Sequence, residues 1–353
     1  MMDLTEREAA AVTALQRGVP LVPRPFREVG AACGLTEDEV VALLARLLAG
    51  GEARRFGGIF DARRIGFRSA LCCMDVPAAD LASVAGKVTA VEGVTHAYER
   101  GWPTVLPRDL AGGPRDERWP NLWFTLATEA ARFPGELERL RTVCRPYAIE
   151  ELPATRRFKI DVVFDVRTRN RDERVEPRPG DGLLRHDQEP PVRLSEAERE
   201  IIRLFQGHIE PVAACFEEPA RRLGMTEAAL LVRLAAWRES GVMRRLGLLL
   251  HHRKAGFTAN GMCCWACAAD EVLERGRLLA ACPEVTHCYE RPAHPGFPFN
   301  LFAMIHAGDW LATCACFRRI GEHAGLTDGR LLFSLQEFKK TSMTFFSRKG
   351  EET

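Results

Sequence analysis

The sequence predicts an α+β protein built as a tandem repeat, in which each unit is a winged helix-turn-helix followed by a ferredoxin-like domain. The first observation is an internal repeat, in which Gly34-Leu35-Thr36-Glu37 returns as Gly224-Met225-Thr226-Glu227. The second is a change of hydrophobic period within each unit, from helical spacing to the alternation of strands. Both observations indicate that the chain of 353 residues is two copies of one unit.

The domain boundaries follow from these periods and from one stretch of unusual composition. We expect winged helix-turn-helix domains at residues 1–60 and 194–250, ferredoxin-like domains at 61–166 and 251–353, and a linker at 167–193. The linker is rich in charge and proline, so it buries little and can span a gap between the units. We expect the two ferredoxin-like sheets to pair as a pseudo-twofold dimer inside one chain.

Local signals place each element of the first unit in order. Capping boxes at Thr5 and Thr36 start the first and third helices, and the third ends at Gly50-Gly51. Arg54–Phe60 is then expected to form a two-stranded wing. Strands at 69–76, 94–100, 121–127 and 158–164 and helices at 78–91 and 134–144 complete a β-α-β-β-α-β order. The second unit repeats this order from Asn260 through Phe346.

Composition excludes several classes of protein. No apolar run approaches the ~20 residues of a membrane span, and the N-terminus lacks the basic start and apolar run of a secretory signal. We therefore expect a cytoplasmic protein with no membrane partner. The net charge of +1 gives no basic excess for nucleic acid. The 12 cysteines are expected to be structural free thiols, not disulfides or a metal site.

A six-residue motif at matching places in the two units marks a candidate site. Thr95-His96-Ala97-Tyr98-Glu99-Arg100 in the first unit corresponds to Thr286-His287-Cys288-Tyr289-Glu290-Arg291 in the second. Each copy brings an imidazole, a phenol, a carboxylate and a guanidinium together on one expected strand. The alternative is a strand end whose polar residues face solvent, but the recurrence in both units favours a site.

A helix-turn-helix suggests DNA binding, yet the expected recognition helices lack a basic face. The first carries Glu37, Asp38 and Glu39 against Arg46, and in the second two acidic residues cancel two arginines. A recognition helix must meet phosphates and base edges, which favours basic and polar residues. We therefore expect weak or no DNA binding.

A helix-turn-helix beside a ferredoxin-like domain resembles the Lrp/AsnC family of transcription regulators. Longer motifs resemble one branch of that superfamily, the siroheme decarboxylases of haem d1 and alternative haem biosynthesis. In the first unit, Val22-Pro23-Arg24-Pro25-Phe26 and Asn121-Leu122-Trp123-Phe124-Thr125-Leu126 resemble NirD/AhbA-type subunits. In the second unit, His287-Cys288-Tyr289-Glu290-Arg291-Pro292 and Glu337-Phe338-Lys339-Lys340-Thr341-Ser342-Met343 resemble NirL/AhbB-type subunits. The whole chain resembles a two-unit fusion of the NirDL type.

This resemblance implies a carboxy-lyase that removes CO₂ from two acetate side chains of siroheme to give 12,18-didecarboxysiroheme. It implies no added cofactor, because the iron tetrapyrrole is itself the substrate. It also makes homologous NirG- and NirH-type subunits candidate partners. The alternatives are a ligand-responsive transcription regulator of the Lrp/AsnC type or a tetrapyrrole-binding sensor.

Chemistry assigns roles to the candidate residues. Arginine binds carboxylates bidentately, and the carbon that loses CO₂ needs a proton, which a histidine of ordinary pKa can supply. We expect catalytic roles for His287, His96, His252, Arg291, Arg100 and Tyr289, with His252 or His287 as an alternative ligand of the substrate's iron. We expect substrate-binding roles for Arg54, Arg55, Arg244, Arg245, Arg253, Tyr98, Asn300, Asn121 and Lys339.

Structural alternatives to these roles remain open. They are a solvated basic turn at His252, packing at the rim of the site for the two tyrosines, and turn caps for the two asparagines. Because a long insertion, Gly101–Pro120, follows the motif of the first unit, we expect His287 to matter more than His96.

Overall fold

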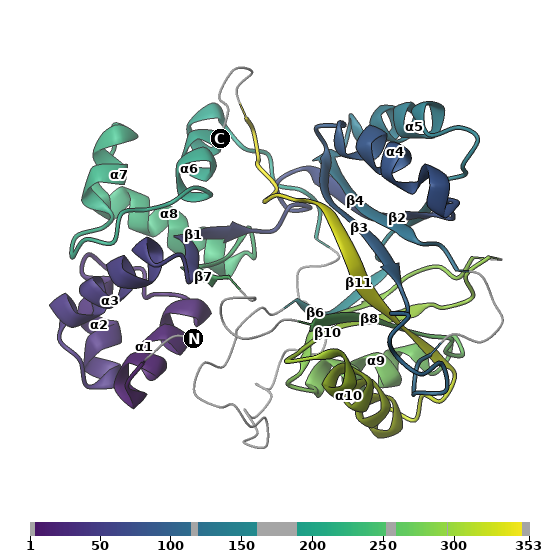
Figure 1. Ribbon diagram of the computed structural model, residues 1–353. Coiled ribbons are helices and arrows are strands. Elements are labelled where there is room, and N and C mark those ends of the chain that lie inside the picture. The colour runs from purple at the N-terminus through teal and green to yellow at the C-terminus, as the bar shows by residue number, and fades with distance from the viewer. Residues whose placement is uncertain (1–3, 114–118, 161–188, 252–258, 295, 348–353) are drawn as a thin grey trace.

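The structure is a computed structural model that describes residues 4–113, 119–160, 189–251, 259–294 and 296–347. It has a helical part beside a part rich in β-strands, as Figure 1 shows. The helical part contains α1 (Glu6–Arg17), α2 (Pro25–Cys33), α3 (Glu37–Ala49), α6 (Glu196–Phe205), α7 (Glu217–Arg222) and α8 (Glu227–Glu239). Thr5, Thr36 and Ser195 form capping boxes at the first turns of α1, α3 and α6. The predicted α+β fold with a repeated helix-turn-helix is confirmed.

The wing differs from the prediction, because each unit supplies a single strand to it. β1 (Ala53–Phe60) pairs antiparallel with β7 (Met243–Leu250) of the other unit. Gly57 lies opposite Gly247 at the centre of this pair. A Cβ on Gly57 would lie 2.2 Å from the carbonyl oxygen of Gly207, and one on Gly247 would lie 2.4 Å from that of Leu15. Side chains are therefore excluded where the helices pack against this sheet.

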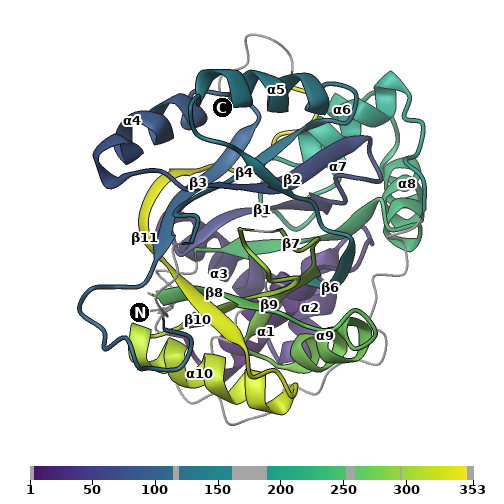
Figure 2. The same cartoon turned by 90° about the vertical axis from the view of Figure 1, so that its right-hand side faces the viewer.

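The strand-rich part is one nine-stranded sheet with helices on its outer faces. Its strands are β2 (Phe67–Met74), β3 (Val94–Gly101), β4 (Leu122–Glu129), β5 (Glu150–Leu152), β6 (Arg156–Ile160), β8 (Ala259–Trp265), β9 (Val285–Glu290), β10 (Leu301–Ala307) and β11 (Gly329–Lys340). Their order is β5-β2-β4-β3-β11-β8-β10-β9-β6. The helices α4 (Ala78–Thr89) and α5 (Phe133–Val143) lie on one side, and α9 (Val272–Ala281) and α10 (Trp310–His323) lie on the other (Figure 2).

The two units exchange the strands that close their sheets. We expected a strand at 158–164 to close the sheet of the first unit. In the structure β6 pairs instead with β9 of the second unit. Residues 161–164 of the expected strand lie outside the described residues. The short strand β5, beside β2, closes the first sheet instead. β11 pairs with β8 of its own unit and then continues along β3 of the other. The units therefore share one sheet within the chain.

This sheet curves around an inner core. Its two end strands, β5 and β6, are separated in the chain only by residues 153–155, so the ends of the strand order lie near each other. The inner core takes side chains from both units, among them Trp123 of β4 and Phe302 of β10. Separate clusters fill the space between each half of the sheet and its own helices. Burial of apolar surface on both faces accounts for this arrangement.

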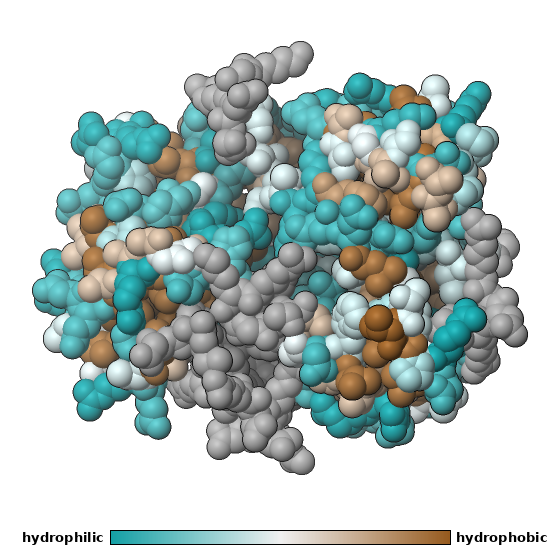
Figure 3. Space-filling view, in the orientation of Figure 1, coloured by the Kyte–Doolittle hydropathy of each residue, from teal (hydrophilic) through white to brown (hydrophobic). Residues whose placement is uncertain are grey.

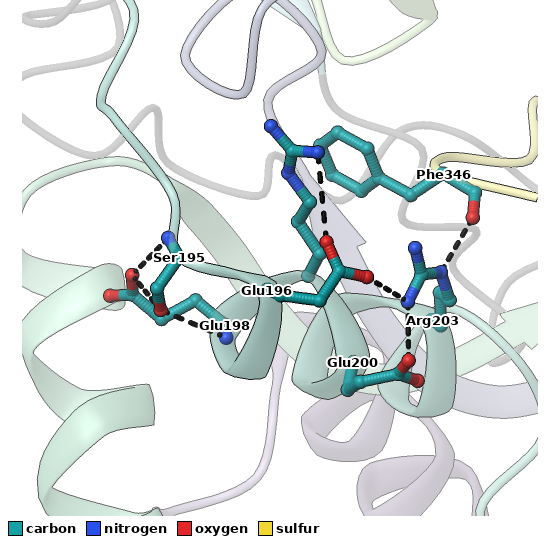
Figure 4. Close-up of polar contacts among 7 residues, drawn as sticks. Ser195, Glu196, Glu198, Glu200, Arg203 and Phe346 are labelled. Atoms are coloured by element: carbon teal, nitrogen blue, oxygen red, sulfur yellow. Dashed lines mark hydrogen bonds and ion pairs between the residues drawn. The ribbon is translucent and has the colours of Figure 1, made fainter.

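The segment after β11 ties the sheet to the helical part, as Figure 4 shows for Phe346. Arg203 of α6 donates from Nε to the carbonyl oxygen of Phe346 at 2.6 Å. The amide of Gln206 both donates to the carbonyl oxygen of Phe345 and accepts from its N–H, at 2.9 and 2.7 Å. Both phenylalanine rings also contact Phe67 at the start of β2.

The cysteines are thiols that lie mostly in the interior. All twelve cysteines are free and ten are buried, and no cluster of potential metal ligands occurs among the residues that the structure describes. In the same part of the chain no helix is long and apolar enough to cross a membrane. The surface in Figure 3 mixes hydrophilic and hydrophobic residues, and the exposed apolar side chains include Trp310, Leu311 and Leu335.

Candidate functional site

The two predicted motifs form matched rows on the inner face of the nine-stranded sheet. Tyr98 of β3 pairs with Trp123, and Tyr289 of β9 pairs with Phe302. Trp123 and Phe302 both belong to the inner core. Directly paired residues share a face, and side chains alternate along a strand. The histidine, tyrosine and arginine of each row therefore project toward the inside of the sheet. The rows lie close to each other, since, after burial and Arg244, a protonated His96 would also contribute to lowering the pKa of His287.

A β-bulge precedes each histidine. In β9 the pairing passes from Val285 to His287 while β10 advances by one residue, which leaves Thr286 as the extra residue. Thr95 holds the same position before His96 in β3. Bulges bring neighbouring side chains together and re-aim them. Each threonine Oγ1 consequently lies 3.0 Å from the Nδ1 atom of the histidine that follows it.

Neither histidine keeps the ordinary pKa on which the sequence argument depended. Burial lowers the pKa of His96 to about 4, and Lys340 and Arg54 add to the effect. Burial, with a smaller contribution from the charge of Arg244, likewise lowers the pKa of His287 to about 4. Both imidazoles are therefore neutral at pH 7 until an anion enters the site. Desolvation and nearby cations account for both shifts, because each of them disfavours the charged ring.

The arginines at the inner ends of the rows are buried cations. Arg100 is 8% exposed, and no described residue accepts a hydrogen bond from its Nε or Nη1. Its guanidinium lies 5.2 Å from the centre of the Tyr98 ring. Arg291 lies 4.8 Å from the Tyr289 ring and donates from Nη1 to the carbonyl oxygen of Leu152. Buried polar groups are normally paired, so Arg100 is a candidate anchor for an anion.

The arginines on β1 and β7 divide between two sides of the wing. Arg54 donates to Ser342 Oγ at 2.8 Å and is close enough to lower the pKa of His96. The charge of Arg244, after burial, likewise lowers the pKa of His287. Arg55 follows Arg54 in the strand and lies on its opposite face. It donates from Nη1 to the carbonyl oxygens of Gly58 and Gly207, both at 3.3 Å. The structure thus gives Arg55 a structural role in place of the predicted substrate contact, and Arg245 occupies the matching position in β7.

Asp61 is a member of the His287 side that the sequence argument missed. Its Oδ2 accepts from Arg244 at 2.7 Å and from Arg157 at 3.2 Å. Burial raises the pKa of Asp61, but the two arginines outweigh burial and hold the pKa below its usual value. The repeat places His251 at the matching position of the second unit. An acidic residue in one unit thus stands where the other unit has a histidine. This difference between otherwise similar units is the feature of the sequence that could have pointed to Asp61.

Asn121 and Asn300 make the same pair of hydrogen bonds in their respective units. Asn121 accepts from the N–H of Val76 at 2.9 Å and donates to the carbonyl oxygen of Val76 at 2.8 Å. Asn300 does the same with Cys267, at 2.9 and 2.7 Å. Their amides therefore join the ends of neighbouring segments. The structure favours the turn-cap alternative over substrate binding.

Lys339 likewise has a structural partner. Its Nζ donates to the carbonyl oxygen of Thr89 at the C-terminus of α4, at 2.8 Å. A lysine at this position interacts favourably with the helix dipole. The structure thus places Lys339 on the helix side of the sheet, and it is the neighbouring Lys340 that pairs with His96.

Two predicted site residues, His252 and Arg253, lie outside the described residues. The described part of the insertion packs on the second unit, where the Leu331 N–H donates to the carbonyl oxygen of Gly112 at 3.0 Å and Trp102 contacts Phe333. The insertion leaves β3 beyond Arg100, at the opposite end from His96. It therefore gives no reason to rank His287 above His96.

The fold and the rows define a tandem of helix-turn-helix and ligand-binding domains with a charged interior. A model of the AsnC-like ligand binding domain matches residues 64–159 and 254–339. A model of the siroheme decarboxylase NirDL-like HTH domain matches residues 8–54 and 198–244. A siroheme decarboxylase of Hydrogenobacter thermophilus is 34% identical over 344 residues, which is 96% of this chain and 94% of that protein. The chain therefore belongs to the siroheme decarboxylase family.

Further relatives match in sequence and in structure. The crystal structure of the siroheme decarboxylase NirDL is 29% identical and covers 97% of this chain and 95% of its own, with a TM-score of 0.70. A second structure of that name, in co-complex with an iron-uroporphyrin III analogue, is 28% identical with a TM-score of 0.66. The siroheme decarboxylase beta subunit of Methanosarcina barkeri is 36% identical over 150 residues, covering 42% of this chain and 99% of that subunit. A separate subunit there corresponds in length to one unit here.

Proposed function

We propose that this chain is a siroheme decarboxylase that removes CO₂ from two acetate side chains of its substrate and leaves methyl groups. The product is then 12,18-didecarboxysiroheme, and no cofactor besides the iron tetrapyrrole takes part. Family membership supports the reaction class. The observation that carries the assignment of the site is the pair of His-Tyr-Arg rows. In one of them Arg100 is buried, and two of its nitrogens have no hydrogen-bond partner among the described residues.

Arginines hold and desolvate the substrate in this proposal. Arg54, Arg244, Arg100 and Arg291 offer guanidinium groups to a tetrapyrrole that carries several carboxylates. Carboxylates that the arginines do not neutralise lie near the histidines. A nearby negative charge raises a histidine pKa, so the neutral imidazole takes up a proton as the substrate binds.

The proton taken up by the imidazole completes the reaction. The bond between the methylene carbon and the carboxylate breaks, CO₂ leaves, and the electron pair remains on the methylene carbon in conjugation with the macrocycle. The imidazolium then gives its proton to this carbon, which becomes a methyl group. The guanidinium groups cannot take this role, because arginine keeps its proton.

Product mass tests the function directly. Purified protein is incubated without oxygen with siroheme, and the tetrapyrroles are separated and weighed by mass spectrometry. We expect an intermediate that lacks one CO₂, followed by a product that lacks two. Unchanged siroheme, bound with a shifted absorption spectrum, would contradict the enzyme and favour a tetrapyrrole sensor.

A DNA-binding regulator is the second candidate, and the ion pairs on the helices argue against it. Arg24 and Arg46 are paired with Glu37 and Glu8, and Arg233 lies 3.0 Å from Glu198. These intramolecular pairs neutralise cations that a phosphate backbone would need. We expect weak, unselective binding in a gel-shift titration with the promoter of its own gene, and tight sequence-specific binding at physiological salt would favour the regulator.

The assembly and location belong to the same proposal. The shared sheet supports an intrachain pseudo-dimer that does the work of two separate subunits. Homologous subunits of the NirG and NirH type remain proposed partners. A cytoplasmic location fits the twelve free cysteines, because thiols stay reduced in that compartment.

A further inference from the structure

The contacts of Thr286 distinguish it from its counterpart Thr95. Thr286 Oγ1 lies 3.2 Å from the carbonyl oxygen of Met304 and 3.0 Å from Nδ1 of His287. Thr286 is 7% exposed, so water does not readily replace either contact. Thr95 Oγ1 has the contact to Nδ1 of His96 at 3.0 Å, but no described carbonyl oxygen accepts its proton.

A count of donors decides how these groups share their protons. A hydroxyl has one proton to donate, and a carbonyl oxygen can only accept. If Thr286 donates to Met304, its oxygen accepts from the Nδ1–H of His287, and two hydrogen bonds form. If Thr286 donates to Nδ1, it no longer donates to the carbonyl oxygen of Met304, and one hydrogen bond remains in place of two. In a buried site the first arrangement is favoured, because unmade hydrogen bonds are costly there.

We propose that Thr286 is a positioning residue that holds His287 in the Nδ1–H tautomer and so leaves Nε2 as the unprotonated nitrogen. The hydrogen bond at one ring nitrogen sets the state of the other. No described residue hydrogen-bonds to Nε2 of His287. This nitrogen is thus the one that takes up a proton with the substrate and later returns it to the methylene carbon. The inference rests on the proposed function for the use of the proton, but the tautomer itself does not depend on it.

Nitrogen NMR of the full chain without substrate tests the tautomer. The protein is labelled with ¹⁵N-histidine, and the nine histidines are correlated with their ring protons. The spectrum of His287→Gln identifies the resonances of His287. We expect the signal of a protonated nitrogen at Nδ1 and of an unprotonated nitrogen at Nε2. A wild-type spectrum with the proton on Nε2 would overturn the proposal whatever the activity.

Three variants separate positioning from folding. Thr286→Ser keeps the hydroxyl and is expected to keep the tautomer and the turnover. Thr286→Val keeps the shape, and is expected to move the proton to Nε2 and to lower kcat about tenfold with little change in KM, as for other residues that orient a functional histidine. Thr95→Val is the matched control, because it removes the same contact in the other row and should leave the His287 spectrum unchanged.

The outcomes distinguish this inference from the proposed function. A Thr286→Val protein that keeps the Nδ1–H tautomer shows that the threonine does not set it and overturns the inference. The expected tautomer with no decarboxylation in the wild type supports the positioning role and contradicts the enzyme. If Thr286→Val does not fold, the wild-type and Thr286→Ser spectra still decide the tautomer.

Discussion

Asp61 Oδ2 lies 2.7 Å from the Arg244 guanidinium, so a carboxylate from the first unit pairs with an arginine from the second. Arg157 approaches the same oxygen to 3.2 Å, and Asp61 is 6% exposed. This buried cluster joins β6, the wing and the segment after β1 next to the His287 row. It also neutralises part of the positive charge that would otherwise meet a substrate there.

Asp61→Asn should destabilise the folded chain by about 3 kcal/mol at pH 7, because it leaves two partly buried arginines, Arg157 and Arg244, without a carboxylate. The asparagine oxygen can still accept from the N–H groups of Arg63 and Arg64, so the turn is retained. The pKa of Asp61 is lowered in the folded state, so its contribution is present above the ordinary value near 4 and is lost as the pH falls through the lowered pKa.

Urea unfolding of both proteins between pH 7 and pH 3 measures this difference. The gap between wild type and Asp61→Asn should narrow at the acid end. Glu136→Gln is the control, because it removes an exposed helical ion pair with Arg132 at 3.2 Å, worth less than about 0.5 kcal/mol. An Asp61→Asn protein as stable as wild type at pH 7 would contradict the cluster's role.

His96 and His287, which are partly buried, should make the protein lose stability as the pH falls from about 6.5 to about 4. Their folded-state pKa is about 4, and the unfolded chain binds protons already near 6.5. Stability therefore rises with pH in this window, by at most roughly 3 kcal/mol for each histidine. Unfolding at pH 7 and pH 5 should show the loss in wild type and a smaller loss in a His96→Gln/His287→Gln double variant. His323→Gln, at an exposed position, should behave as wild type.

His287→Gln should lower decarboxylation about 100-fold, the scale of a lost general acid, while siroheme binding changes little. The side chain cannot transfer the proton, but the arginines that hold carboxylates remain. His96→Gln should cost less, because Thr286 fixes the tautomer of His287 and no described carbonyl oxygen anchors Thr95 in the same way. Single-turnover product analysis separates the two steps. If both variants lose activity equally and each accumulates a different product with one CO₂ removed, each histidine serves one acetate. If both variants decarboxylate at nearly the wild-type rate, the proton donor is another group.

The sequence was sufficient for the repeat, for most elements and for the two rows, because hydrophobic period and motif recurrence are local signals. The pairing of β6 with β9 was not accessible, since either unit offers an edge of similar composition to that strand. The bulges at Thr95 and Thr286 were also hidden, because they arise from a one-residue mismatch between paired strands. The low pKa of the histidines depends on burial by both units together. The hydrogen bonds of Asn121 to Val76 and of Lys339 to Thr89 were hidden for the same reason, because these partners become neighbours only in the fold.

Arg100→Met should weaken substrate binding and yet spare the stability of the free protein. The Arg100 guanidinium is buried, and its Nε and Nη1 meet no acceptor among the described residues. A buried cation without such partners costs free energy, so an apolar side chain of similar length should leave the melting temperature unchanged or raise it.

A substrate carboxylate that supplies the acceptors missing around Arg100 would stabilise the complex by about 1.5–3 kcal/mol. Absorbance titration with siroheme in the absence of oxygen should therefore show a dissociation constant about 10- to 100-fold larger in the variant. Arg55→Met is the matched control, since its guanidinium already donates to Gly58 and Gly207 and the variant should lose stability but not affinity. An Arg100→Met protein that melts lower and binds as tightly as wild type would assign Arg100 to the structure and not to the substrate.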